Sequence, residues 1–265
     1  MTPLSREGYI VQIAARHFWE DMARPAQYRT PLDRESANSL LLSCLFNRGL
    51  DWQRAMSIVD EMKRRSLITD AVELFGSLSV EQLEFLMFDD PVDYSVDGGR
   101  NGALHRYRYM AQYASLMSKR LVDVWGGDAR NMYADEPLGS ELQERLMAFK
   151  GVGRKISSMQ IRIWVLSNGV VLFNGYQGID VSPDRCVRRV MVRLGLVAED
   201  CTPQDIINKA RELSPLCAVE CEGMFVIGQD FCHADLNTAD CRHCDLSPAC
   251  NTAQRTIATK TNKSP

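Results

Sequence analysis

Apolar residues recur at helical spacing along almost the whole chain. In the first such stretch, Ile10, Ile13, Ala14 and Phe18 would lie on one face of a helix over residues 7–23. Comparable patterns predict further helices over residues 36–46, 51–65, 81–88, 104–125, 141–149, 154–166, 183–194, 204–213 and 219–231. The sequence therefore predicts an all-α protein with short connections.

Capping and turn residues set the expected limits of several elements. Ser182 and Pro183 precede a stretch with helical spacing, so we expect Ser182 to cap that helix and Pro183 to occupy its first turn. Residues 89–102 contain Pro91 and three glycines and are predicted to form a polar loop. Residues 251–265 are polar and are predicted to form a disordered tail.

Length and composition are typical of a soluble globular protein. The chain has 265 residues, a net charge of −3, 45% apolar residues and 25% charged residues, which excludes a largely disordered chain. We find neither a run of about 18 apolar residues nor an apolar secretion signal, and so expect a cytoplasmic protein without membrane contact. In such a protein, nine cysteines favour metal binding or catalysis over disulfides.

Basic residues gather in one segment of this acidic protein. Between Arg145 and Gly195 there are nine basic and two acidic residues, a net charge of +7, which leaves −10 for the rest of the chain. Such a block is typical of a surface that binds a polyanion. A solvated helix face has the same composition, so charge alone does not decide between nucleic acid and solvent.

The last four cysteines form the most specific motif. Cys232, Cys241, Cys244 and Cys250 lie within nineteen residues, close enough for their thiolates to bind one metal centre. Only one Cys-x2-Cys pair is present, whereas zinc ribbons usually have two. The uneven spacing therefore favours a 4Fe–4S cluster over zinc, with free thiols as a third interpretation.

A glycine turn between two predicted helices forms the second motif, Phe149-Lys150-Gly151-Val152-Gly153-Arg154-Lys155. Glycines allow a tight turn and a close approach to another surface, and the N-terminus of the next helix favours a phosphate. Lys150, Gly151, Gly153 and Arg154 are thus predicted to bind a DNA backbone without reading its sequence. An ordinary turn between helices is the alternative.

Together with a downstream aspartate, these motifs resemble those of the helix-hairpin-helix DNA glycosylases. The glycine turn, the segment Asp184-Arg185-Cys186-Val187-Arg188-Arg189-Val190 and the four cysteines are most similar to the endonuclease III branch. The resemblance extends from about Ser36 to Cys250, which is most of the chain. It implies two helical lobes around a DNA-binding cleft, a helix-hairpin-helix motif and a C-terminal loop around a 4Fe–4S cluster.

The resemblance also implies domains and a partner. Residues 34–168 would form a six-helix, barrel-like domain with the hairpin, and residues 1–33 with 169–250 would form the iron–sulfur domain. The partner would be double-stranded DNA with one nucleotide flipped out, bound by a monomer. Such a protein would be associated with the nucleoid in a bacterium, or would act in the host cytoplasm if a phage encodes it.

Two residues match the family's catalytic pair. Lys155 would attack C1′ of the sugar, expel the base and form a Schiff base, and β-elimination would then nick the strand. A cationic neighbourhood and partial burial would lower the pKa of this amine. Asp184 would stabilise the cationic sugar or assist proton transfer, with helix capping as the plainer role. Further DNA contacts are expected from Asn47, Arg48, Arg100, Asn101, Arg185 and Arg188.

Some residues depart from the family pattern. Lys150 replaces a usual proline, Arg185-Cys186 replaces a usual Thr-His, and the gap of 29 residues between Lys155 and Asp184 is longer than usual. The segment 167–182, which fills this gap, is expected to lie near the substrate pocket.

These departures leave three hypotheses for the activity. The leading one is a DNA glycosylase with AP-lyase activity on an altered base, in particular a pyrimidine. The second is an enzyme of phage-type thymine hypermodification, which joins an amine to an activated 5-methylene group and leaves the glycosidic bond intact. The third is a non-catalytic DNA-binding module.

Overall fold

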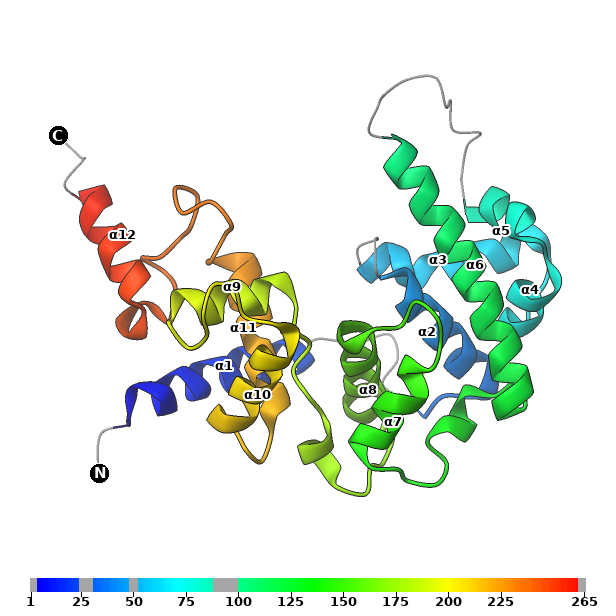
Figure 1. Ribbon diagram of the computed structural model, residues 1–265, viewed down its shortest axis with the longest axis horizontal. Helices are drawn as coiled ribbons and strands as arrows, with labels where there is room; N and C mark the ends of the chain where they lie inside the picture. The colour runs from blue at the N-terminus through cyan, green and yellow to red at the C-terminus, as the bar shows by residue number, and fades with distance from the viewer. Residues whose placement is uncertain (1–3, 24–30, 48–51, 88–99, 262–265) are drawn as a thin grey trace. The chain divides into compact units, whose positions relative to one another are not determined.

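A computed structural model describes residues 4–23, 31–47, 52–87 and 100–261, and every regular element within these ranges is helical. The all-α prediction is therefore confirmed (Figure 1). The α-helices are α1 (Arg6–Ala23), α2 (Arg34–Phe46), α3 (Trp52–Ser66), α4 (Ala71–Ser77), α5 (Val80–Met87), α6 (Arg100–Trp125), α7 (Gly139–Met147), α8 (Arg154–Asn168), α9 (Arg185–Arg193), α10 (Pro203–Leu213), α11 (Gly223–Asp230) and α12 (Asn251–Thr261). Short 3-10 helices are η1 (Ala129–Met132), η2 (Gly175–Gly178), η3 (Ala218–Glu222) and η4 (Ser247–Ala249).

The chain divides into two compact units. The central unit comprises residues 30–160 and 168–173, and the terminal unit comprises residues 1–29, 161–167 and 174–265. The N-terminal helix thus folds with the C-terminal third of the chain, and helix α8 contributes residues to both units.

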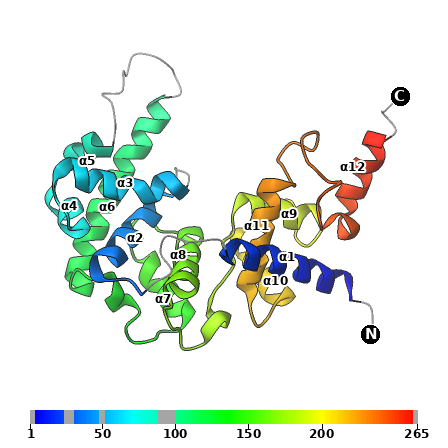
Figure 2. The same ribbon diagram turned by 180° about the vertical axis from the view of Figure 1, so that it is seen from behind.

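Helix α6 organises the central unit, where it packs against α2, α4 and α5 (Figures 1 and 2). The predicted buried helix α2 supplies the core, with Leu40, Leu42 and Phe46 at most 1% exposed. Its one deeply buried amide, Asn38, donates to the Gly127 carbonyl at 2.9 Å and accepts from the Ala129 N–H at 2.8 Å. A buried polar side chain with both partners satisfied fixes how the start of α2 meets the end of α6.

The terminal unit has a second core, built where α1 packs on α11 and η3. Gly223 permits this approach, because a Cβ there would lie 1.9 Å from the Ala14 carbonyl oxygen. Gly228 plays the same part between α11 and α9, where a Cβ would lie 2.6 Å from that of Cys186. Backbone segments far apart in sequence therefore touch only because these positions lack side chains.

Three local predictions were wrong. Helix α9 begins at Arg185 with Asp184 as its N-cap, so Ser182 is not the cap and Pro183 lies outside the helix. The expected disordered tail contains helix α12, whose Ala253 is 4% exposed. Residues 100–102 of the expected loop belong instead to α6, which begins at Arg100, and residues 89–99 lie outside the described residues.

Among the described residues, none of the helices combines the length and the apolar character that a membrane span requires.

Candidate nucleic-acid interface

The glycine turn is a tight hairpin packed on α6. Phe149 is buried and the Val152 N–H donates to its carbonyl at 3.1 Å, which closes the turn. Gly151 has a φ of +92°, and a Cβ at this position would lie 2.5 Å from the ring of Tyr113. Both the backbone conformation and the neighbouring ring therefore require glycine here.

The N-terminus of α8 is open to solvent directly after this turn. A Cβ on Gly153 would meet nothing within 4 Å, and Lys150, Arg154 and Lys155 are exposed. The first turn of a helix presents N–H groups that its own backbone cannot bond, together with the positive end of the helix dipole. The exposure of Lys155 corrects the expectation of partial burial. This surface offers a phosphate both backbone donors and three cations.

Asp184 lies in the terminal unit and caps α9. It is 8% exposed, and its Oδ1 accepts a hydrogen bond from the Cys186 N–H at 2.8 Å. Asp184 therefore has the plainer role, helix capping. The cap orients the carboxylate, and a carboxylate that caps a helix can still take part in a reaction. Asp180, four residues earlier, forms a bidentate pair with Arg211 at 2.8 Å and has a structural role.

Sequence reasoning missed the groups that hold the turn before Asp184. The Ser182 N–H donates to Glu222 Oε2 at 2.6 Å, and Glu222 Oε1 lies 3.2 Å from Arg162 Nη1. Burial raises the pKa of the Glu222 carboxyl, while Arg162 and the Ser182 N–H act to lower it. No local pattern marks Glu222, because its partners lie 40 and 60 residues away along the chain.

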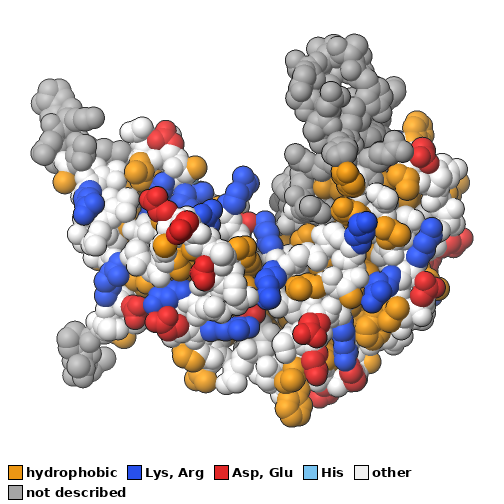
Figure 3. Space-filling model, viewed as in Figure 1, with side chains coloured by type: hydrophobic (Ala, Val, Ile, Leu, Met, Phe, Trp, Pro, Cys, Tyr) orange, Lys and Arg blue, Asp and Glu red, His pale blue; other side chains and the backbone are white. Residues whose placement is uncertain are grey.

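The basic segment separates into exposed cations and structural ones. Arg145 pairs with Asp135 at 2.6 Å, and Arg162 pairs with Glu222. Within each unit, acidic side chains are interspersed among the basic ones on the face that Figure 3 shows. The segment's charge therefore overstates the cationic surface that it presents.

Arginines of α9 hold the loop that contains the cysteines. Arg189 donates to the Cys232 carbonyl at 2.5 Å and to the Gly228 carbonyl at 2.6 Å. Arg193 donates to the His233 and Ala234 carbonyls at 2.7 and 2.8 Å, and its Nη1 lies 3.2 Å from Cys232 Sγ. These two guanidinium groups therefore have a structural role within the terminal unit.

The four predicted metal ligands line one apolar cavity. Cys232, Cys241, Cys244 and Cys250 all contribute to its wall. Among the described residues, no group of three or more His, Cys, Asp or Glu side chains is arranged to hold a metal ion. Burial raises the pKa of the Cys244 thiol to about 11, so metal binding there would release a proton.

The remaining predicted DNA contacts are less well placed. Arg185 and Arg188 are exposed on α9, although Arg188 also donates to the Glu199 carbonyl. Asn47 is the C-cap of α2. Arg48 lies outside the described residues, and α6 includes Arg100 and Asn101 without a description of their side chains.

Part of the long segment after α8 lies away from Lys155. The Phe173 N–H donates to the Pro137 carbonyl at 3.2 Å, just before α7, and the Phe173 side chain is 80% exposed. Helix α8 has 15 residues, so about 22 Å of helix separates its two ends. Phe173 therefore follows the end of α8 that is opposite to Lys155.

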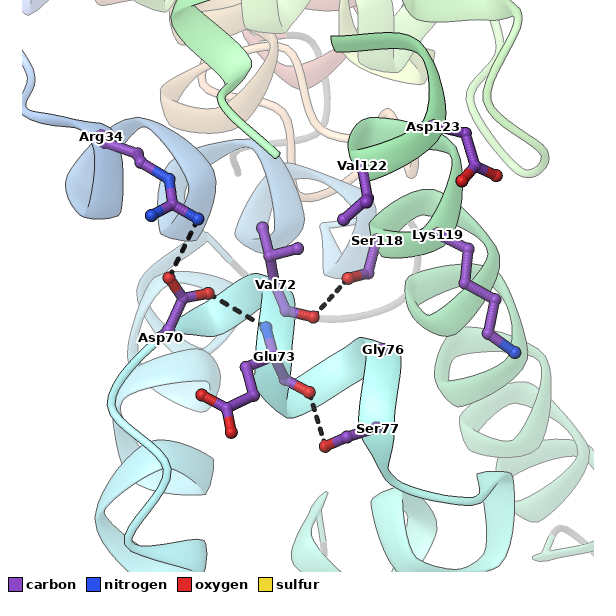
Figure 4. Close-up of a pocket in the computed structure, with 10 residues that line it drawn as sticks. All are labelled: Arg34, Asp70, Val72, Glu73, Gly76, Ser77, Ser118, Lys119, Val122 and Asp123. Carbon is purple, nitrogen blue, oxygen red and sulfur yellow. Dashed lines mark hydrogen bonds and ion pairs between the residues drawn. The ribbon is translucent and has the colours of Figure 1, made fainter. Parts of the chain in front are cut away.

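The central unit also contains an open pocket of about 650 Å³ between the start of α2, α4 and α6 (Figure 4). Arg34 and Asp70 form an ion pair of 3.3 Å on its wall, and Ser118 Oγ donates to the Val72 carbonyl at 2.5 Å. Its other charged residues are Glu73, Lys119 and Asp123. Charges of both signs line it and none of the predicted site residues does, so we do not assign the function to this pocket.

Comparisons with known proteins give the fold. No protein-family model matches the sequence, and no curated protein matches it. Two endonuclease III–DNA complexes match at 16% identity: a trapped covalent intermediate with an estranged adenine, at a TM-score of 0.66, and a non-covalent complex, at 0.65. These matches cover 96% and 97% of this chain and 100% of the other chains.

A thermostable thymine-DNA glycosylase matches at 13% identity and a TM-score of 0.63, over 94% of this chain and 97% of its own. The chain thus has the helical fold of endonuclease III and of this thymine-DNA glycosylase, which confirms the all-helical fold that the resemblance implied.

Proposed function

We propose that this protein is a DNA glycosylase with AP-lyase activity that excises an altered pyrimidine from double-stranded DNA. The observation that carries the proposal is the exposed N-terminus of α8, with Lys155 in its first turn, in a chain with the fold of endonuclease III. Endonuclease III forms a covalent intermediate with DNA. An exposed lysine at an anion-binding helix end is suited to the same chemistry.

The hairpin would bind the DNA backbone. Gly153 leaves room for a phosphate to approach the first N–H groups of α8, and Lys150 and Arg154 add cations beside it. Because such contacts do not read bases, recognition would depend on the flipped nucleotide.

Lys155 and Asp184 would perform the chemistry. The neutral Lys155 amine would form a bond to C1′ as the glycosidic bond breaks, and the base would leave with the electron pair and take up a proton. Asp184 would stabilise the positive charge that develops on the sugar. The nitrogen would then lose a proton, the C1′–O4′ bond would break, and O4′ would take up a proton, which opens the sugar ring and gives the protonated Schiff base. Removal of a C2′ proton would then expel the 3′ phosphate.

Cys232, Cys241, Cys244 and Cys250 would hold a 4Fe–4S cluster. All four line one apolar cavity, which supports a shared centre. The N–H of Arg193 beside Cys232 Sγ would stabilise a thiolate. When bound, the cluster would tie the loop together through its four iron–sulfur bonds.

Borohydride trapping tests the proposal. Duplexes would carry thymine glycol, 5-hydroxycytosine, 5-hydroxymethyluracil, a G·T mismatch or a ready-made abasic site, with Lys155→Ala beside the wild type. We expect a covalent adduct with the wild type and none with Lys155→Ala. Lys150→Ala is the matched control, since it removes an exposed lysine of the same hairpin and should retain the adduct at saturating DNA.

The absence of an adduct on every duplex, the abasic one included, would overturn the lyase mechanism. A mass increase of the DNA without base loss would instead support base modification, and binding without either change would support a non-catalytic module. Iron and acid-labile sulfide in equal amounts in the purified protein would support the cluster, and zinc would contradict it.

A further inference from the structure

A buried polar cluster surrounds the turn that presents Asp184. Glu222 and Ser182 are 5% and 2% exposed. The carboxylate of Glu222 accepts the Ser182 N–H at 2.6 Å, and the Ser182 carbonyl in turn accepts the Asp184 N–H at 2.6 Å. Asp184 then caps α9 through the Cys186 N–H. One carboxylate thus holds the backbone two residues before the proposed catalytic acid.

This cluster is not expected to add much to the free energy of unfolding. Taking the charges of Glu222 and Arg162 out of water is unfavourable, and an apolar pair of similar volume is often as stable. Ser182 Oγ and Arg162 Nε are moreover buried without a hydrogen-bond partner among the described residues. Such unsatisfied groups call for an explanation other than the free energy of folding.

We infer that Glu222, kept in place by Arg162, is a positioning residue that fixes the turn over residues 182–184 and thereby the orientation of the Asp184 carboxylate. The inference rests on the proposed function. It assigns Glu222 a role through Asp184 and no contact with the substrate. The α9 N-cap and the Glu222 contact together constrain the turn from both sides of Asp184.

Two paired variants separate this role from mere packing. Glu222→Leu with Arg162→Met removes both charges together, so that neither is left buried alone. Glu222→Gln with Arg162→Met also removes both charges but retains a carbonyl acceptor for the Ser182 N–H. We expect the apolar pair to lower kcat for base removal at least about tenfold with KM unchanged, and the amide pair to recover most of it.

The decisive test introduces the apolar pair into a protein that already carries Asp184→Asn. If Glu222 acts through Asp184, the apolar pair lowers base removal no further once Asp184 has been replaced. The substrate would be whichever duplex of the trapping panel loses its base fastest. Full activity in the apolar pair, or an equal further loss in the Asp184→Asn background, would overturn the inference.

Amide hydrogen exchange makes the test independent of catalysis. The Ser182 and Cys186 N–H groups should exchange faster in the apolar pair and at the wild-type rate in the amide pair, measured by NMR at matched global stability. Unchanged exchange in the apolar pair would overturn the inference. A wild type that removes no base would overturn the proposed function instead, and the exchange rates would still decide whether Glu222 holds the turn.

Discussion

The hairpin over residues 150–155 and helix α9 are both rich in basic residues, yet they use them differently. In the hairpin, Lys150, Arg154 and Lys155 are exposed beside a helix N-terminus. In α9, the two arginines nearest the C-terminus bind backbone carbonyls of α11 and of the cysteine loop, and two cysteine sulfurs. Basic residues thus form an exposed cationic surface in one segment and internal contacts in the other. The difference depends on whether hydrogen-bond acceptors lie within reach of each side chain.

The largest effect should come from the glycine that shapes the hairpin. Gly151→Ala places a side chain at a φ of +92° and 2.5 Å from the Tyr113 ring. We expect the free energy of unfolding to fall by about 3 kcal/mol, measured by urea denaturation.

Gly153→Ala is the matched control for this change. Its Cβ meets nothing within 4 Å, so unfolding should change by less than about 0.5 kcal/mol. Affinity for an abasic duplex should fall, because the methyl group would stand where a phosphate approaches. Equal stability of the two variants would show that the hairpin does not require glycine at position 151.

The next largest effect should distinguish the two kinds of arginine. Arg193→Met removes the donor to two loop carbonyls and to Cys232 Sγ, and we expect a loss of about 2 kcal/mol in unfolding free energy and a lower iron content.

Arg154→Met serves as the counterpart on the exposed surface. Its stability should stay within about 0.5 kcal/mol of the wild type, while the salt dependence of DNA affinity should lose about one unit of slope. The contrast between the segments would fail if Arg154→Met destabilised the protein and Arg193→Met left it intact.

A smaller effect concerns pH and the buried carboxyl of the terminal unit. Burial raises the pKa of Glu222 above its usual 4.5, against the opposing effects of Arg162 and the Ser182 N–H, and Asp184 raises it further. The folded state therefore binds this proton more tightly than the unfolded chain. The resulting stability is complete below pH 4.5 and is lost as pH rises through the raised pKa.

Glu222→Gln should remove this contribution, which changes by at most about 1.4 kcal/mol per pH unit. Urea denaturation of both proteins at several pH values above 4.5 measures the difference. A difference in unfolding free energy that does not vary with pH would contradict the prediction.

The smallest effect is expected at Phe173. Its side chain is 80% exposed and follows the end of α8 opposite to Lys155. Phe173→Ser should therefore change stability by less than about 0.5 kcal/mol and leave borohydride trapping unchanged. A strong loss of trapping would place this segment at the substrate, as its length in the sequence first suggested.

The helices and the hairpin could be predicted because their signals are local. The apolar spacing of α2 and the glycines of the hairpin need no partner elsewhere to be recognised. Helix α4 has seven residues, which is too short for a clear period. Helix α12 was missed because its support is tertiary: Thr252 Oγ1 donates to the Arg193 carbonyl at 3.0 Å, and Ala253 is buried.

The sequence predicts a set of candidate site residues, which stays a prediction, and it does not predict how they are arranged. Asp184 could be chosen over Asp180 from the residues that follow it, and the pair between Asp180 and Arg211 agrees with that choice. Glu222 could not be found, since an isolated glutamate has no pattern and its burial depends on contacts across the fold. The net charge of the basic segment overstated its exposed cationic surface for the same reason. The sequence does not show which basic side chains already pair with acceptors inside the fold.

Helix α9 is held in its first turn by Asp184 and farther along by the loop of cysteines. If these cysteines take up a cluster, metal occupancy and the placement of Asp184 become linked equilibria, and the linkage is reciprocal. DNA that engages the ordered turn would then tighten the hold on iron, and loss of iron would weaken the engagement.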